Sequence, residues 1–161
     1  MNYDEISKQT FAVVKSMEKA LMAKSNDMDK YFHKDFRWMG NQGCGTKQNL
    51  KEFRNNWQLP LRAAFSDRVY KTDKFLVDGE WASCFGYIDA IHSGEFMGIA
   101  PTNKRVKIHY TDFWEVKDGL ITDNWVTVDF PSILAQLGVD VFNGQGWEVF
   151  DRGELEPPKP N

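Results

Sequence analysis

The sequence has few cysteines, no long apolar run and no excess of basic side chains. Its two cysteines, Cys44 and Cys84, lie in dissimilar contexts, which favours free thiols in the cytoplasm over a disulfide. No apolar segment approaches the roughly 18–20 residues of a membrane span, and the N-terminus lacks a signal-peptide profile, so we expect no membrane association. A formal net charge of −3, with both signs mixed along the chain, argues against nucleic acid as a partner.

Motifs that hold metals or nucleotides are also missing. The three histidines are far apart, with no His-Glu-x-x-His and no cysteine pair, so no metal site is expected. The glycine-rich segment 40–45 lacks the Gly-Lys-Ser/Thr of a phosphate-binding loop, and no nucleophile elbow or dinucleotide fingerprint is present. These absences leave a cofactor-free site of Asp and His side chains, walled by aromatic residues.

Aromatic residues are abundant instead. Twelve Phe and six Trp in 161 residues indicate a large core, an aromatic-lined cavity or a buried subunit interface. A chain of this length forms one domain with a substantial core. We expect that domain to span residues 1–139, followed by an extension, 140–161, whose aromatic residues Phe142, Trp147 and Phe150 anchor its first part and whose end is irregular.

Hydrophobic periodicity predicts helices first, then a meander of strands, then one last helix. Three- and four-residue spacing of apolar side chains predicts the helices, and alternation with Asp-Gly turns predicts antiparallel strands. The expected helices cover 4–23, 27–32, a segment from Thr46 to about Leu61 that Pro60 kinks or ends, and a segment beginning at Pro131; the expected strands cover 35–39, 68–77, 80–92, 104–116 and 120–128. This order indicates an α+β fold.

Asp112 is the first candidate for chemistry. The even positions from 106 to 116 are otherwise apolar or aromatic and should face inward, which places this carboxylate in a buried column. A buried carboxylate costs several kcal/mol unless it is paired, hydrogen-bonded or protonated. A structural ion pair and a functional role remain equally open on this pattern.

Asp129 is the second candidate. It follows the strand 120–128 and shares a face with Trp125 and Thr127, so it would open into a pocket at the strand end. It also precedes Pro131, where Asp is a favoured N-cap and Pro a favoured first-turn residue. Residue types alone favour the cap, and the two roles are compatible.

His92 is the third candidate. The inward positions before it, from Ala82 to Ala90, are small or apolar, and such residues on a curved sheet leave space. A histidine at the rim of that space would serve as an acid, a base or an orienting donor, although a structural role is the more frequent one. Asp89, on the opposite face, is a rival acid if the faces are reversed.

Several short motifs together resemble the SnoaL-like polyketide cyclase family of the NTF2-like superfamily, with Thr102-Asn103-Lys104 replacing the usual Thr-Gly-Lys. They are His92-Ser-Gly-Glu-Phe96-Met97-Gly-Ile-Ala-Pro101-Thr102, Asp112, Asp118-Gly119-Leu-Ile121, Trp125-x-x-x-Asp129 and Gln136-Leu137-Gly138. The resemblance implies a cone-shaped α+β fold in which helices pack into a strongly curved antiparallel sheet around an apolar pocket. It also implies an Asp acid/base in an intramolecular aldol ring closure without metal or cofactor, a role that falls on Asp129, with His92 as pocket histidine and Asp112 facing the cavity.

The expected function is therefore acid/base catalysis on a small apolar carbonyl compound, as a cyclase, isomerase or dehydratase. The alternative is a binding module of the same fold that lacks catalysis. The side chains expected to contact substrate are Trp38, Trp57, Phe96, Met97, Tyr110 and Trp125. A homodimer is expected because Val126 and Val128, assigned to the second sheet face, need covering. The extension would close the pocket or wrap a partner subunit, and we expect the second.

Overall fold

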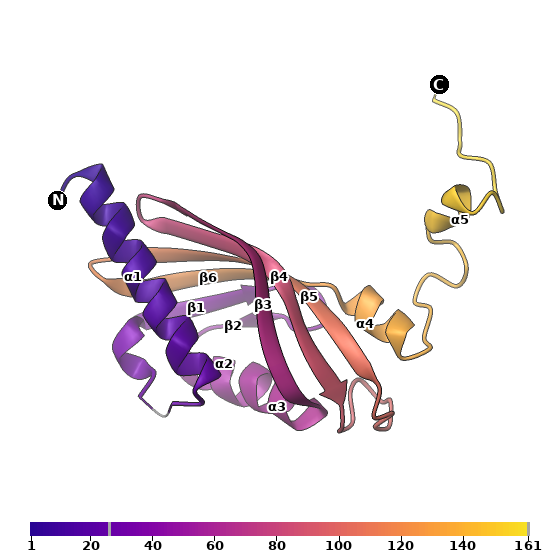
Figure 1. Ribbon diagram of the computed structural model, residues 1–161, viewed down its shortest axis with the longest axis horizontal. Helices are drawn as coiled ribbons and strands as arrows, with labels where there is room; N and C mark the ends of the chain where they lie inside the picture. The colour runs from indigo at the N-terminus through magenta and orange to yellow at the C-terminus, as the bar shows by residue number, and fades with distance from the viewer. Residues whose placement is uncertain (26, 161) are drawn as a thin grey trace.

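A six-stranded, strongly curved sheet organises the computed structural model, which describes residues 1–25 and 27–160 (Figure 1). The strands are β1 (Phe32–Gly40), β2 (Thr46–Lys47), β3 (Phe65–Asp78), β4 (Trp81–His92), β5 (Arg105–Lys117) and β6 (Leu120–Val128), in the spatial order β2-β1-β6-β5-β4-β3. Neighbouring strands are antiparallel except β1 and β6, which are parallel. The predicted α+β class is confirmed, and the parallel pairing of β1 with β6, inside the sheet, is the one departure from an antiparallel sheet.

The hairpin turns lie where the Asp-Gly pairs predict them. Gly79 and Gly119 have φ values of +58° and +76°, and Asp118 also has a positive φ of +50°. Glycine adopts this backbone region without the steric cost that a side chain brings, which suits the tight turns between long strands. The four long strands therefore begin and end within three residues of their predicted limits.

The helices are α1 (Tyr3–Met22), α2 (Leu50–Phe53), α3 (Leu59–Ala64), α4 (Phe130–Gln136) and α5 (Glu148–Asp151), with a 3₁₀ turn at Asp29–Tyr31. The prediction that a helix begins at Thr46 is wrong, because Thr46 pairs with Met39 of β1. The helix begins after Asn49, whose side chain accepts a hydrogen bond from the backbone N–H of Glu52 at 2.9 Å. Among the described residues, no helix combines the length and the apolar character needed to cross a bilayer.

Pro60 does not end the helix that contains it. A π-helical turn, Arg54–Gln58, connects α2 to α3, and the N–H of Leu59 bonds to the carbonyl of Arg54. Proline has no N–H and crowds the preceding turn, and a widened turn accommodates it without breaking the helix. The side chains of Trp57 and Gln58, in this widened turn, line a cavity.

The even-numbered positions of β4 and β5 face the interior, as the sequence pattern predicts, and those of β6 do so from Asn124 onward. Gly86 does not add space there, contrary to the prediction. A Cβ at this position would lie 2.1 Å from the carbonyl oxygen of Lys71 on β3. The pairing of β3 with β4 shifts register between Thr72 and Lys74, so glycine permits close approach of a bulged neighbouring strand.

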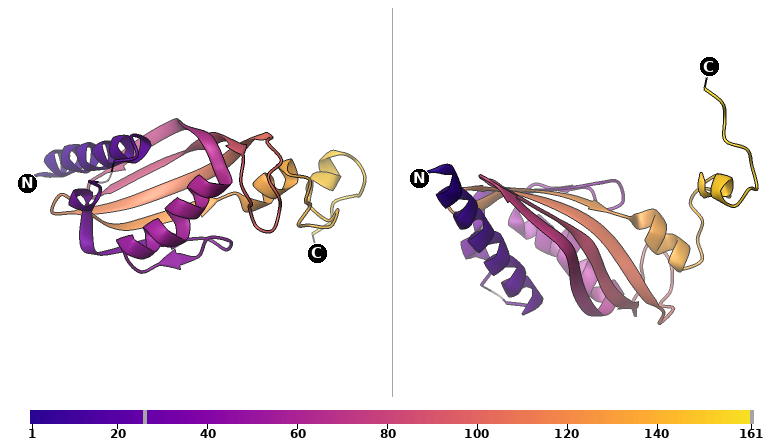
Figure 2. Two further views of the ribbon diagram at one scale, coloured as in Figure 1. Left: turned by 90° about the horizontal axis from the view of Figure 1, so that it is seen from below. Right: turned by 45° about the horizontal axis from the view of Figure 1, so that its top comes forward.

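The chain beyond α4 projects away from the rest of the domain (Figures 1 and 2). We call residues 139–160 the C-terminal arm. Val149 is buried within it, whereas Phe142 and Trp147 are 51% and 75% exposed. These two aromatic residues do not anchor the arm to the domain of their own chain, because the arm leaves the domain instead of folding back on it.

Candidate functional site

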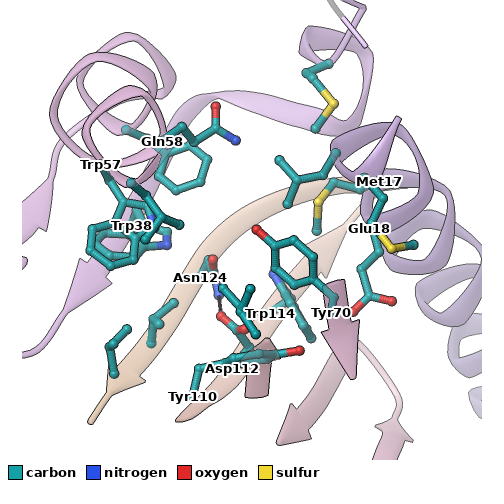
Figure 3. A pocket seen from close by; sticks show the side chains of 18 of the residues that line it. Met17, Glu18, Trp38, Trp57, Gln58, Tyr70, Tyr110, Asp112, Trp114 and Asn124 are labelled. Carbon is teal, nitrogen blue, oxygen red and sulfur yellow. Dashed lines mark hydrogen bonds between the residues drawn. The ribbon is translucent and has the colours of Figure 1, made fainter. Parts of the chain in front are cut away.

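A cavity of about 300 Å³ lies between the concave face of the sheet, α1 and the α2–α3 segment (Figure 3). Strands β3 to β6 form its floor, and side chains of α1 and of the π-helical turn form opposing walls. Most of its surface is apolar or aromatic. The polar side chains at the cavity are Lys15, Glu18, Gln58, Tyr70, Thr72, Tyr110, Asp112 and Asn124. The cavity is large enough for a small organic molecule.

Two tryptophans form an aromatic wall. The rings of Trp38 and Trp57 stack with their centroids 5.0 Å apart and an interplanar angle of 28°. Phe53 packs against Trp38 at 5.5 Å. Figure 3 shows the tryptophan pair across the cavity from Tyr70 and Glu18. The structure thus places both tryptophans where the sequence expected substrate contacts, and their flat surface suits a planar apolar ligand.

Asp112 and Asn124 form the polar centre of the floor. Asn124 Nδ2 donates to Asp112 Oδ1 at 3.0 Å and to the carbonyl oxygen of Phe113 at 3.1 Å. The β5–β6 register pairs Asp112 with Val126 and Trp114 with Asn124, so the two polar side chains are diagonal neighbours on one face. The second hydrogen bond, to the strand backbone, fixes the orientation in which Asn124 presents its amide to the carboxylate.

Burial raises the pKa of Asp112 from 3.8 to about 7. The desolvation of the carboxylate is the main cause, because its charged form is poorly solvated in the cavity. The hydrogen bond from Asn124 opposes this rise, and the negative charge of Glu18 adds to it. An acid with a pKa near neutrality populates both protonation states, which is what proton transfer in both directions requires.

Two tyrosines and an ion pair surround this carboxylate. Burial raises the pKa of Tyr70 and of Tyr110, so both phenols stay protonated and can donate hydrogen bonds. Their rings meet edge to face with centroids 6.4 Å apart. Glu18 on α1 pairs with Lys15 at 2.9 Å. The cavity therefore combines an acid that titrates near neutral pH, Asp112, with two neutral phenol donors on the sheet and the Lys15–Glu18 ion pair on α1.

His92 does not reach the cavity, contrary to the prediction. It is completely buried at the end of β4, where its ring packs against Phe65 and Phe96. Its Nδ1 accepts a hydrogen bond from the backbone N–H of Thr102 at 3.2 Å and lies 3.1 Å from Thr102 Oγ1. His92 faces inward as the alternation predicts, but aromatic rings fill the space there. The contacts fit the structural alternative, a histidine that fixes the loop before β5.

Asp129 also lies outside this cavity and does not face the apolar hollow where it was expected. It lines a separate, open groove between α4 and the C-terminal arm. Its side chain is exposed, and its Oδ1 accepts a hydrogen bond from the N–H of Ser132 at 3.0 Å as the N-cap of α4. The inward face of β6 belongs to Asn124, Val126 and Val128, so the odd-numbered positions point outward. Val126 and Val128 are accordingly buried against the cavity and need no partner subunit to cover them.

The remaining predicted contacts divide between two sides of the sheet. Tyr110 lines the cavity, whereas Trp125 is 51% exposed on the outer face. Phe96 packs on Phe65 and stacks on the ring of Phe130, outside the cavity, and Met97 is exposed. The rival acid Asp89 forms an ion pair with Arg105 at 3.0 Å on the outer face.

Sequence reasoning did not single out six polar residues of the cavity: Lys15, Glu18, Gln58, Tyr70, Thr72 and Asn124. The parity of Asn124, which it shares with Val126 and Val128, would have identified it once the inward face of β6 was assigned correctly. Glu18 follows Met17 on α1, and no local pattern distinguishes it from a solvent-exposed acid. Only the packing of α1 over the sheet brings it to the cavity.

Comparisons with known proteins point to one family. The family model described as SnoaL-like polyketide cyclase matches residues 12–137. Nogalonic acid methyl ester cyclase of Streptomyces nogalater is 26% identical over 127 residues, which cover 77% of this chain and 92% of that protein.

Solved structures show the same fold. IdmH of Streptomyces antibioticus, assigned as a polyketide cyclase, superposes with a TM-score of 0.70 at 22% identity, covering 81% of this chain and 99% of its own. AclR of Streptomyces galilaeus, assigned as a hydroxylase, gives a TM-score of 0.70 at 20% identity, covering 82% and 97%. Two different assignments on one fold mean that the chemistry must be argued from the side chains of the cavity.

Proposed function

The chain belongs to the SnoaL-like polyketide cyclase family, and we propose from this premise that it is an acid/base enzyme without a cofactor. Its substrate would be a small apolar carbonyl compound held in the cavity, and its reaction an aldol-type ring closure. The relationship to a named cyclase supports a cyclase-type function. The observation that carries the mechanism is the partly buried Asp112 carboxyl on the cavity floor, whose pKa is raised by desolvation to about 7 in a cavity walled by aromatic side chains.

Asp112 is the acid/base in this proposal, in place of Asp129. Asp129 is exposed and engaged as a helix cap, and His92 is enclosed by aromatic rings, so neither would meet a ligand in the cavity. Asp112, by contrast, lines the cavity. A general base must come within hydrogen-bond reach of the proton that it removes, which selects Asp112 among the three candidate residues.

In the proposed reaction, Asp112 removes one proton from the substrate and later returns it to the product. The Asp112 carboxylate takes a proton from the carbon next to a carbonyl group, leaving an enolate. The enolate carbon attacks a second carbonyl carbon of the same molecule and forms the new C–C bond. The alkoxide that results takes the proton back from Asp112. General acid/base catalysis of this kind raises the rate roughly 10²–10⁴-fold. The cavity adds a further acceleration by orienting the two reacting carbons.

Neighbouring groups would assist in three ways. Asn124 binds one carboxylate oxygen of Asp112, which leaves the other oxygen for the substrate. Tyr70 or Tyr110, both protonated, would donate a hydrogen bond to the enolate oxygen as charge develops there. The stacked Trp38–Trp57 pair would hold a planar substrate against the opposite wall. Asn124 is thus a positioning residue, and the tyrosines are candidate catalytic residues.

Hydrogen–deuterium exchange into a ketone tests the proposal without knowledge of the natural substrate. The probe is 2-tetralone, an apolar aromatic ketone with an activated methylene group. In D₂O near pH 7, the wild-type protein should accelerate exchange of the α-hydrogens above the buffer rate, as followed by NMR. Asp112→Asn should bring the rate back to that of buffer, whereas Asp129→Asn should exchange as the wild type does. Exchange that persists in Asp112→Asn would contradict the assigned base.

The same experiment separates an enzyme from a binding module. A binding module would take up 2-tetralone, seen as shifts in the tryptophan fluorescence, without accelerating exchange. An isomerase or dehydratase would use the same proton abstraction and would also catalyse exchange. Product analysis with polyketide-type substrates that carry two carbonyl groups then distinguishes ring closure from those reactions, because only ring closure forms a C–C bond.

A further inference from the structure

A groove of about 580 Å³ adjoins the cavity between the end of α1, the α2–α3 segment and the first residues of β3. Trp57, Gln58 and Tyr70 line both the cavity and the groove, so the two spaces meet at these side chains. Figure 3 shows Trp57 and Gln58 on one side of the cavity and Tyr70 on the other. A ligand in the cavity can therefore extend between these side chains into the groove.

The groove is basic, although the chain as a whole carries a formal net charge of −3. Its charged side chains are Lys24, Arg62, Asp67 and Arg68, and we call this space the basic groove. Within the described part of the chain, none of its three basic residues forms an ion pair. Basic side chains without an acidic partner, next to an apolar cavity, are available to an anionic group of a ligand.

A β-bulge directs Arg68 into the basic groove. The pairing of β3 with β4 shifts register between Ser66 and Val69, and Asp67, within this shift, has a positive φ of +48°. Strict alternation would place Phe65 and Arg68 on opposite faces of the strand. With the bulge, Phe65 is fully buried and Arg68 lines the groove. Bulges of this kind re-aim side chains next to functional sites.

The two arginines lie close to the junction with the cavity. Arg68 donates a hydrogen bond to the carbonyl oxygen of Phe65, which uses one of the five N–H groups of its guanidinium. Burial raises the pKa of Tyr70, and the positive charges of Arg68 and Arg62 oppose this rise. Both guanidinium groups therefore act on the phenol that stands between the groove and the cavity. An anion that they bind would lie at the entrance to the cavity.

We propose that the basic groove binds a carboxylate of the substrate while the apolar part of the same molecule lies in the cavity. A carboxylate matches the fork of a guanidinium and forms charge-assisted hydrogen bonds with it, which are stronger than those between neutral groups. The inference rests on the proposed function, because it adds a carboxylate to the apolar carbonyl compound assigned to the cavity. It makes Arg62 and Arg68 specificity-determining residues, and Lys24 adds to the attraction of the anion.

This binding mode would orient the ligand. The stacked rings of Trp38 and Trp57 hold a planar molecule but do not distinguish its two ends. A carboxylate held by Arg62 and Arg68 fixes which end stays in the groove, so the other end faces Asp112. Orientation of this kind lowers the barrier because the reacting carbons no longer sample unproductive positions.

Binding of matched ligands tests the proposal. The ligands are 2-tetralones with a carboxylate on an alkyl chain of one to three carbons, each compared with its uncharged methyl ester. Tryptophan fluorescence reports binding, because Trp57 lines both spaces. At pH 7 and low salt, the wild type should bind the best carboxylate roughly 10-fold more tightly than its ester, through the charge-assisted hydrogen bonds that it gains. This advantage should shrink as the salt concentration rises.

Substitution of the arginines tests which side chains recognise the charge. Arg62→Gln and Arg68→Gln should each lower the affinity for the carboxylate roughly 10-fold more than the affinity for the ester. Comparing the two ligands in one variant separates the loss of charge from a loss of folded protein, which would weaken both equally. Arg37→Gln is the matched control, since it also removes one positive charge. Arg37 pairs with Asp123 at 2.8 Å on the outer face, so this variant should keep the preference for the carboxylate.

Asp112→Asn separates this inference from the proposed function. The variant should still prefer the carboxylate although it no longer catalyses exchange, so a preference without exchange supports the groove and contradicts only the enzyme. Exchange without a preference contradicts only the groove. Equal affinity of the wild type for every carboxylate and its ester, or equal weakening of both ligands in the arginine variants, would overturn the inference. Competition by acetate or inorganic phosphate at the concentration of the ketone would also overturn it, because the groove would then bind free anions.

Discussion

Replacing Asp112 by Asn is expected to make the protein more stable at alkaline pH. The folded protein must keep a carboxylate in a poorly solvating cavity above neutral pH, whereas the unfolded chain exposes it to water. A neutral amide removes that penalty. Asn at this position also retains a side-chain oxygen that can accept the hydrogen bond from Asn124, so the main contact of the site is preserved.

The size of the effect follows from the shift in pKa. A rise in the pKa of Asp112 from its ordinary value of 3.8 to about 7 in the folded protein corresponds to about 4 kcal/mol as an upper figure, at 1.36 kcal/mol per unit. Because the folded-state pKa is the higher one, the folded state holds the proton that the unfolded state releases between about pH 4 and 7. The free energy of unfolding of the wild type should therefore fall across that interval by about 1.4 kcal/mol per pH unit from this group, and stay level above it.

The assay is urea denaturation of wild type and Asp112→Asn at pH 4.5, 6 and 8. Comparing the two proteins at each pH cancels the other titrating groups, so the difference in the free energy of unfolding reports Asp112 alone. The free energy of unfolding of Asp112→Asn should rise relative to that of the wild type by about 3 kcal/mol from pH 4.5 to 8. Asp129→Asn is the matched control: it makes the same chemical change outside the cavity, and Asn also caps helices, so the helix cap should be retained. A difference for Asp112→Asn that does not change with pH would refute the reasoning.

Four other substitutions test separate parts of the structure. Asn124→Ala removes a donor to the charged form of Asp112 and should raise the pKa of that carboxyl further, measured by ¹³C NMR of labelled aspartate. Asp129→Ala should lower the free energy of unfolding by about 1 kcal/mol in urea denaturation through loss of the helix cap, while α-hydrogen exchange into 2-tetralone stays unchanged. Gly86→Ala should destabilise the protein by roughly 2–4 kcal/mol, because its methyl group meets a backbone carbonyl; unchanged thermal stability would refute that account. His92→Ala should cost roughly 2–4 kcal/mol through the cavity and the unpaired N–H that it leaves, with exchange activity preserved in the folded fraction.

The strands and the main helices were predictable because their signals are local. Asp-Gly pairs mark Gly79 and Gly119 as turn positions, and alternation between them fixes the extent of the four long strands. The inward column of β5 was also correct, and with it the placement of Asp112. The start of α2 was misassigned because Thr46 and Asn49 are both good N-caps, and the choice depends on whether residues 46–47 pair with β1.

The site itself was only partly predictable. The two faces of β6 both carry apolar residues, Val126 and Val128 on one and Trp125 on the other, so hydrophobicity does not identify the inner face. The inward position of His92 was correct, but its neighbours Phe65 and Phe96 come from other segments and fill the space around it. The sequence analysis thus placed Asp129 and His92 in the cavity, although neither residue lines it.

The sequence by itself determined the α+β class, the extent of the four long strands, the family and the inward column that contains Asp112, because these depend on periodicity and on residues close together in the chain. The tertiary structure decided which residues share the cavity with Asp112. Glu18 arrives from α1, Trp57 from the π-helical turn and Asn124 from β6, and the packing of these elements on the concave face of one curved sheet brings them together. That packing also sets the pKa of Asp112, since desolvation depends on everything that surrounds the carboxyl in space.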